Sequence, residues 1–360
     1  MSQFSAEIKI DNLTNEKCCH FKNSILNIDN KNFNLLVPNN YFSNLPKQIY
    51  LKSSPEEPLI LKKIENYEEN TKNITCLNGI WVIISKYVST NAGHVLGDEV
   101  FAIWQALSVF NLQNKDINII TNNYDIHIQQ YKCLTKNKLF SFEEFKNKYF
   151  KFENLIVGMS RNGYALGFTN LKNDSRLLKN RASYLPDFTN TVNKFREHTF
   201  KIFDINNTNI NNKIKTILIL DKDEKVADHK CKLYEINNII NFLKEKYNNY
   251  NIKKICWNGM SIKDQVNEIA FADIIISLPG SDLMNCIFLN PKSYIICPNR
   301  FYKNGKKENS NEIDIWFRHT HKCLEITDVT IVYKDNKLYS KINDLNMLFR
   351  IIDNIINNNI

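Results

Sequence analysis

A histidine and an aspartate four residues apart are the side chains in this chain best suited to acid–base chemistry. His94 and Asp98 lie in the segment Asn-Ala-Gly-His-Val-Leu-Gly-Asp-Glu, which covers residues 91–99. On an α-helix, residues at this spacing share a face and can touch. A carboxylate that holds one ring nitrogen fixes the imidazole tautomer and raises the basicity of the other nitrogen. The spacing predicts a general base, His94, oriented by Asp98. The alternative is a capping interaction at a helix N-terminus.

Three further polar residues are candidates for the acceptor side of such a reaction: Asn91, Glu99 and Arg161. A metal centre would need a third and a fourth ligand beside His94 and Asp98. The segment His319-Thr-His321 could supply two from one strand face. Nothing else in the pattern has the spacing of a metal site, so we expect no metal here.

A second constellation is an apolar run that ends in a glycine turn and leads into a helix. The run Ile274–Ile276 is followed by Pro279 and Gly280, and another apolar run begins at Leu283, after Ser281 and Asp282. Free amides at a helix N-terminus carry about half a positive charge and bind phosphate. Glycine lets the backbone approach a ligand without a Cβ in the way. The pattern predicts a phosphate cradle, and the alternative is an ordinary turn in which glycine supplies a positive φ.

The third constellation is a lysine-rich segment, residues 221–232, that directly follows the apolar run 216–220. Its cations include Lys222, Lys225, Lys230 and Lys232, with His229 between them. Placed at the carboxyl end of a strand, these side chains could neutralise a diphosphate. The alternative is a solvated loop of mixed charge.

Alternating strands and helices are expected to position these residues. In the first half we expect strands at 79–85, 117–120 and 154–157, with helices at 93–110 and 140–149, the second capped by Ser141 over Glu144. In the second half we expect strands at 216–220, 252–257, 273–277 and 293–297, alternating with helices at 234–247, 262–271 and 283–289. The alternation predicts an α/β protein with parallel sheets covered by helices.

Length and turn-forming residues divide the chain into two domains. A chain of 360 residues suits two cores better than one. We expect an N-terminal domain over 1–205, irregular over 1–75 and helical over 176–205. The run Asn-Asn-Thr-Asn-Ile-Asn-Asn at 206–212 is the expected boundary. A second domain follows over 213–335. Residues 336–360 should form a helix that crosses back to the first domain or forms a dimer face. Two Rossmann-like domains of this kind bind ligands in the cleft at the carboxyl ends of their strands.

Bulk composition excludes several classes of protein. The net charge of +9 is mild, and no basic run reaches the five or six residues of a nucleic-acid tail, so we expect no nucleic-acid partner. Anionic small molecules such as nucleotides fit this charge. The nine cysteines are scattered, without a CxxC pair or zinc spacing. There is neither a signal-peptide pattern at the N-terminus nor an apolar run long enough to span a membrane. We therefore expect a cytoplasmic protein with reduced cysteines.

Two sequence blocks resemble glycosyltransferase family 61. The segment at 91–100, NAGHVLGDEV, is similar to the family's Asn-x-x-His-x-x-x-Asp block. Residues 261–297 are similar to its C-terminal block, and FENLIVG at 152–158 is similar to its middle strand. In the C-terminal block the matching residues are Ser261, Gln265, Ala272, Asp273, Gly280, Leu283, Asn285, Phe288, Leu289 and Pro291. The resemblance extends patchily over about residues 80–300.

The resemblance implies a GT-B fold, in which two Rossmann-like doubly wound domains face a cleft. It also implies inverting transfer of a sugar from a nucleotide sugar, often UDP-linked, to a hydroxyl of a glycan or glycoprotein, with no bound metal required. The donor would lie on the C-terminal domain and the acceptor on the N-terminal one. Carried over, Gly280, Ser281 and Leu283 would line the donor diphosphate, and Gln265 would lie near the nucleotide.

This chain departs from the family pattern at two points. Asp282 stands where the family usually has a small residue, and a carboxylate close to a diphosphate lowers affinity unless it points away or meets a sugar hydroxyl. The segment after residue 220 has lysines where the family tends to have arginines, and lysine lacks the bidentate fork. Two alternatives therefore stand beside the transferase: a non-catalytic relative that binds glycans or nucleotides, and another glycan-modifying transferase on the same fold.

Overall fold

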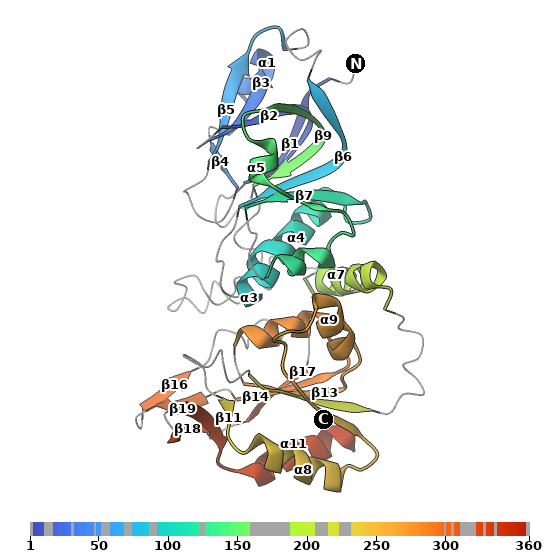
Figure 1. The fold of residues 1–360 in the computed structure, drawn as a ribbon, viewed down its shortest axis with the longest axis vertical. Helices are drawn as coiled ribbons and strands as arrows, with labels where there is room; N and C mark the ends of the chain where they lie inside the picture. The colour runs from blue at the N-terminus through green and yellow to red at the C-terminus, as the bar shows by residue number, and fades with distance from the viewer. Residues whose placement is uncertain are drawn as a thin grey trace. The chain divides into compact units, whose positions relative to one another are not determined.

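The structure is a computed structural model, and it describes residues 3–10, 17–29, 32–46, 48–51, 58–67, 74–85, 92–122, 127–158, 188–205, 215–222, 232–278, 280–298, 300–303, 306–309, 322–326, 329–334 and 337–357. The chain divides into two compact units, Met1–Ala165 and Leu166–Ile360. Each unit has its own cluster of buried apolar side chains. Figure 1 shows the elements of both.

A nine-stranded sheet forms the frame of the first unit, in the order β4-β5-β3-β2-β9-β6-β7-β8, with β1 paired to β2 (Figure 1). The strands are β1 (Ser5–Ile10), β2 (Lys17–Ile28), β3 (Phe33–Pro38), β4 (Gln48–Tyr50), β5 (Pro58–Ile64), β6 (Thr75–Ile84), β7 (Ile117–Thr121), β8 (Leu139–Ser141) and β9 (Tyr149–Val157). Strands β9, β6, β7 and β8 are parallel neighbours. Strand β2 pairs antiparallel with β9, β1 and β3. The strands expected from the first-half alternation are confirmed, but the sheet is mixed rather than wholly parallel.

The N-terminal segment corrects the expectation of an irregular extension over residues 1–75, because β1 to β5 lie within it. The strands were hidden by polar residues at buried positions. His20 and Asn27 are buried on β2, where His20 Nε2 contacts Asn154 Oδ1 at 3.0 Å and Asn27 donates to the carbonyl oxygen of Lys148. These partners lie more than a hundred residues away along the chain. No local pattern can show that such polar groups are satisfied.

The helices of the first unit are short. They are α1 (Asn39–Phe42), α3 (Ala92–His94), the π-helix η1 (Val95–Val100), α4 (Phe101–Val109), the 3₁₀ helix η2 (Ile128–Cys133) and α5 (Phe142–Phe145). The helix expected at 93–110 is confirmed in place, with a π-helical middle. The helix expected at 140–149 is shorter than predicted, because residues up to Ser141 belong to β8 and the backbone is already extended at Lys146, before β9 begins at Tyr149. Its cap is confirmed: Ser141 Oγ accepts from the Glu144 amide at 3.3 Å, and the Glu144 carboxylate accepts from the Ser141 amide at 2.9 Å.

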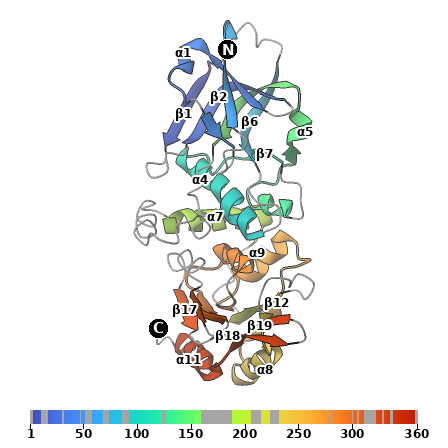
Figure 2. The same ribbon diagram turned by 90° about the vertical axis from the view of Figure 1, so that its left-hand side faces the viewer.

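The second unit is built on a five-stranded parallel sheet in the order β12-β10-β13-β14-β17. The strands are β10 (Thr216–Leu220), β12 (Asn251–Ile255), β13 (Ile274–Ile276), β14 (Tyr294–Pro298) and β17 (Lys322–Ile326), and the helices are α7 (Phe188–Phe203), α8 (Ile236–Lys246), α9 (Ile262–Ala270), the 3₁₀ helix η7 (Ser281–Phe288) and α11 (Leu345–Ile356). Helices α8 and α11 cover one face of this sheet and α9 the other (Figures 1 and 2). The alternation expected for the second half is confirmed, with a 3₁₀ helix at 281–288. Among the residues that the structure describes, no helix is long and apolar enough to cross a membrane.

A second, smaller sheet lies in the same unit, in the order β11-β19-β18-β15-β16. Its strands are β11 (Lys232–Leu233), β15 (Arg300–Lys303), β16 (Lys306–Asn309), β18 (Val329–Lys334) and β19 (Lys337–Ile342). Strand β11 pairs in parallel with β19, so Lys232 lies opposite Tyr339. The C-terminal segment, 336–360, therefore begins with a strand, and its expected helix is confirmed from Leu345 to Ile356.

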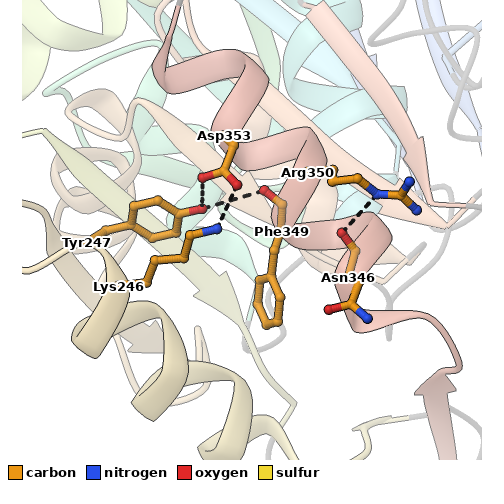
Figure 3. A network of polar contacts seen from close by, with 6 residues as sticks. All are labelled: Lys246, Tyr247, Asn346, Phe349, Arg350 and Asp353. Atoms are coloured by element: carbon orange, nitrogen blue, oxygen red, sulfur yellow. Dashed lines mark hydrogen bonds and ion pairs between the residues drawn. The ribbon is translucent and has the colours of Figure 1, made fainter.

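The last helix packs within the second unit. The buried residues of α11, among them Leu348 and Ile352, join the core that α8 and the parallel sheet share. Tyr247 donates to Asp353 Oδ1 at 2.6 Å, and Lys246 donates to Asp353 Oδ2 at 2.6 Å (Figure 3). Burial alone would raise the pKa of Asp353, but the hydrogen bonds from Lys246 and Tyr247 hold it below its ordinary value. The clamp fixes α11 to the end of α8 instead of the first-unit position considered from the sequence.

Helix α7 also belongs to the second unit. Phe195 is fully buried and its ring lies 5.6 Å from that of Phe288 in η7. Arg196 donates to the carbonyl oxygen of Leu289 at 3.0 Å, and burial lowers the pKa of this guanidinium. The unit division therefore lies earlier in the chain than residues 206–212, the boundary expected from the turn-forming run.

Candidate functional site

The parallel sheet of the second unit has a switch point between β10 and β13. Numbered along the chain, its strands lie in the order 2-1-3-4-5. The connection after β10 leads to one side, to β12, and the connection after β13 leads to the other, to β14. In doubly wound sheets the crevice at such a point, outside the carboxyl ends of the strands, binds the ligand. Here Asp221 and Lys222 follow β10, while Ser277 and Gly280 follow β13.

A small pocket opens at this edge, with a volume of about 220 Å³ that includes space open to solvent. It is lined by Leu220, Asp221, Lys222, Lys232, Leu233, Ser277, Leu278 and Asp282. Lys232 comes from β11 of the small sheet and is only 7% exposed. Lys222 and Lys232, at the two ends of the lysine-rich segment, therefore line the same pocket. The alternative of a solvated loop of mixed charge did not predict this arrangement.

Gly280 lies beside the pocket lysine Lys222, in the turn that follows β13. Its φ is +155°, in a region of the backbone map that other residues rarely adopt. A Cβ at this position would lie 2.8 Å from Lys222 Nζ. The glycine therefore serves the backbone conformation and the close approach of the lysine at the same time. The positive φ agrees with the alternative of an ordinary turn, and the phosphate cradle stays a prediction.

Asp282 forms an ion pair with Lys222, at 3.6 Å between Oδ2 and Nζ. The side chain of Lys222 is 14% exposed and that of Asp282 30% exposed. The backbone of Asp282 is also held, because Trp257 Nε1 donates to its carbonyl oxygen at 3.0 Å. Asp282 is thus oriented toward the lysine, and it does not point away from the pocket.

On the β10 side, Asp221 organises the start of the lysine-rich segment. Its carboxylate accepts from the Lys222 amide at 2.9 Å and lies 3.5 Å from Lys254 Nζ. The sequence pattern singles out neither Trp257 nor Lys254. Lys254 lies near the end of β12, and Trp257 follows that strand. The local sequence does not show whether such a tryptophan only packs, whether such a lysine is only solvated, or whether either reaches the end of a neighbouring strand.

The remaining donor-side candidates have structural contacts. The Gln265 amide donates to the Met260 carbonyl at 3.0 Å and accepts from Asn285 at 2.8 Å, which joins α9 to η7. Leu283 is buried in the core, and its amide donates to the Gly280 carbonyl at 3.1 Å. Ser281 is the first residue of η7 and is partly exposed. Lys225 and Lys230 lie outside the described residues.

The histidine–aspartate block lies in the first unit, after β6. The backbone of His94 ends α3, and that of Asp98 lies in the π-helix η1. Their side chains, together with the whole of Asn91 and Arg161, are outside the described residues. The expected contact between His94 and Asp98 therefore stays a prediction. π-Helical turns inside α-helices are rare and frequently occur at functional sites.

Glu99 occupies the interior of the first unit. It is 1% exposed, and its carboxylate accepts a hydrogen bond from the Tyr131 hydroxyl. Tyr131, in η2, is fully buried. The sequence indicated an acceptor-side role for Glu99, whereas this burial favours a role in holding the π-helical turn.

The described residues hold no cluster of metal ligands. Within those parts of the chain, no three His, Cys, Asp or Glu side chains gather closely enough to hold a metal ion. His319 and His321 are outside those parts.

The family model of glycosyltransferase 61 matches residues 20–296, about three quarters of the chain. The chain belongs to the glycosyltransferase 61 family. The match confirms the resemblance seen in the blocks at 91–100 and 261–297. It starts inside β2, so it takes in N-terminal strands that the resemblance left out. No curated protein matches the chain significantly.

Membership makes this glycosyltransferase 61 protein a transferase of sugars, with a sugar donor and an acceptor as its substrates. The match ends in β14 and so contains both β10 and β13. The pocket at the switch point therefore lies within the part of the chain that defines the family.

Proposed function

We propose that this protein transfers a sugar, with inversion at the anomeric carbon, from a UDP-linked donor to a hydroxyl of a glycan or glycoprotein. In the GT-B manner, the second unit would bind the donor and the first the acceptor. The transfer would need no bound metal, because lysines and backbone amides take over the charge of the leaving diphosphate.

The pocket at the β10–β13 switch point is the observation that carries this proposal. It combines two lysines, a glycine that allows close backbone approach and the first turn of η7 at the carboxyl edge of a parallel sheet. Such cations stabilise the negative charge that develops on the diphosphate as the glycosidic bond breaks. Lys225 and Lys230, from the same segment, would add to this charge when the donor is bound.

The acceptor hydroxyl would lose its proton to His94, with Asp98 orienting the imidazole. General-base catalysis of this kind contributes about a hundredfold to ten-thousandfold in rate. Asn91 and Arg161 would contact the acceptor. Glu99, because it is buried against Tyr131, would hold the π-helical turn that contains Asp98.

His94→Ala tests the base. We expect turnover to fall by about a hundredfold or more, while the dissociation constant for UDP stays unchanged because the donor binds to the second unit. Transfer of a labelled sugar from its nucleotide, followed alongside UDP binding by calorimetry, measures both quantities. Turnover equal to that of the wild type would exclude His94 as the base.

A second candidate function is favoured by the ion pair between Lys222 and Asp282. A carboxylate that occupies the donor lysine suits a relative that binds a glycan or nucleotide without transferring a sugar. Thermal stability with UDP and UDP-sugars, with and without Mn²⁺, separates the candidates when combined with the labelled-sugar assay. Stabilisation by a UDP-sugar together with release of the labelled sugar supports the transferase; stabilisation without release supports the binding protein. Transfer of a different group to the glycan would indicate another transferase on this fold.

A further inference from the structure

We propose that Asp282 is an internal competitor of the donor: before a donor binds, its carboxylate takes the place on the Lys222 amine that a donor phosphate must occupy. The inference rests on the proposed function, since it assumes a diphosphate at this pocket. It assigns to Asp282 the role of a positioning residue that sets the affinity of the site for its anionic ligand.

The position of Lys222 supports the competition. Its amine is confined between the Gly280 backbone and the Asp282 carboxylate, 2.8 Å from the place of a Cβ on Gly280 and 3.6 Å from Asp282 Oδ2. The side chain is largely buried, so the amine keeps a defined position. A phosphate bound at the glycine turn would therefore lie next to this amine.

The backbone of Asp282 cannot move aside freely. Trp257 Nε1 holds its carbonyl oxygen at 3.0 Å, and the residue belongs to the first turn of η7. The carboxylate can leave Lys222 only by rotating about its own side-chain bonds. Its 30% exposure allows this rotation, after which the released carboxylate can be hydrated. Asp282 would therefore lie on the lysine before the donor binds and in solvent afterwards.

The electrostatic consequence is a weaker affinity for anions. A donor phosphate must break the existing ion pair before it can form its own, and it must also approach a second negative charge. Because the pair is partly exposed, the effect should be moderate. A neutral side chain of the same size at position 282 should remove both the competing ion pair with Lys222 and the repulsion of the donor phosphate.

Asp282→Asn tests the proposal in the full chain, with UDP and inorganic pyrophosphate as probes in calorimetric titrations at low salt. We expect the variant to bind UDP about tenfold more tightly than the wild type. Asp282→Ser provides a second variant without the carboxylate.

Glu268→Gln is the matched control. Glu268 forms an ion pair with Lys253 at 2.9 Å in the second unit, so the substitution also removes one negative charge from an ion pair, but Glu268 lies outside the pocket. Lys222→Met should weaken UDP binding about tenfold.

The possible results distinguish failure of the competition by Asp282 from failure of the proposed function. If the wild type binds UDP and Asp282→Asn binds it no more tightly than Glu268→Gln does, the competition is excluded while the proposed function stands. An unchanged UDP affinity in Lys222→Met would also exclude it. If UDP binds to neither protein but pyrophosphate binds to Asp282→Asn and not to the wild type, the competition stands and the UDP-sugar donor falls. If neither probe binds to any variant, both proposals fail.

Discussion

At the scale of single residues, Gly280 serves two purposes. Its backbone conformation is available almost only to glycine, and its missing side chain leaves room for Lys222. Gly259 differs from it in an instructive way: its φ is also positive, at +79°, but a Cβ there would meet nothing within 4 Å. Substitution of the two glycines therefore measures separately the free-energy cost of backbone strain and the effect of a Cβ beside Lys222.

Gly280→Ala should destabilise the protein by about 1–3 kcal/mol, because alanine tolerates this conformation poorly. It should also weaken UDP binding, since the new methyl group displaces the Lys222 amine. Gly259→Ala should destabilise by about 1–2 kcal/mol and leave UDP affinity unchanged. Urea unfolding and calorimetric titration of both variants measure these effects. Equal UDP affinities of the two variants would contradict a role of Gly280 in the pocket.

His20 provides a residue-scale prediction for pH. Burial lowers the pKa of His20; the hydrogen bond with Asn154 acts in the opposite direction, and the nearby charge of Lys22 acts in the same one. The unfolded chain therefore takes up a proton at about pH 6.5, before the folded protein does. Between the two pKa values the unfolded state binds more protons, so the free energy of unfolding decreases as pH falls.

We therefore expect the wild type to lose more stability between about pH 7.5 and about pH 5.5 than His20→Gln does, because glutamine cannot be protonated. Urea unfolding at the two pH values measures the difference. Identical losses in the two proteins would show that His20 does not titrate on unfolding.

At the scale of elements, α8 and α11 are joined by apolar packing and by a clamp of hydrogen bonds at the end of α8. Tyr247 is buried and donates to Asp353, which also accepts from Lys246 (Figure 3). Beside the clamp, the rings of Phe242 and Phe349 stack with centroids 3.9 Å apart. Apolar packing brings the helices together, and the hydrogen bonds to the carboxylate select their register.

Tyr247→Phe should lower the free energy of unfolding by about 1.5 kcal/mol, because a hydrogen bond to a charged group is lost while the ring still packs. Tyr250→Phe is a suitable control, since its ring lies 6.1 Å from that of Tyr247 but its hydroxyl takes no part in the clamp. Denaturant unfolding of the full chain measures both. A loss in Tyr250→Phe as large as that in Tyr247→Phe would mean that ring packing, and not the hydrogen bond, is responsible.

At the scale of the whole molecule, each of the two units has a cluster of buried apolar side chains among its described residues, and the predicted donor pocket lies in the second unit. A ligand that binds only the folded state stabilises by RT ln(1 + [L]/Kd), about 2.7 kcal/mol at a hundred times its dissociation constant. UDP should therefore slow amide hydrogen exchange most strongly in peptides from 216–222 and 274–289. Peptides from β9 in the first unit serve as an internal reference. Stronger slowing in the first unit would place the nucleotide there.

Features that depend on neighbours along the chain could be predicted from the sequence alone. The aliphatic run Thr216–Leu220 forms the strand that its composition predicted, and Ser141 and Ser261 cap their helices through contacts three residues away. The family blocks are local for the same reason, and they showed what kind of chemistry to expect. The turn at Gly280 could also be predicted, because it directly follows an apolar run.

Only the tertiary structure decided which distant residues meet. Lys222 and Asp282 are 60 positions apart, and they pair because β10 and β13 are adjacent parallel strands that end at the same edge. Glu99 was predicted on the acceptor side, but it lies in the interior beside Tyr131. His20 and Asn27, both buried on β2, find their hydrogen-bond partners in Asn154 on β9 and Lys148 next to it. A hydrogen bond or ion pair across a sheet depends on strand order and register, and neither is encoded in the residues on one strand alone.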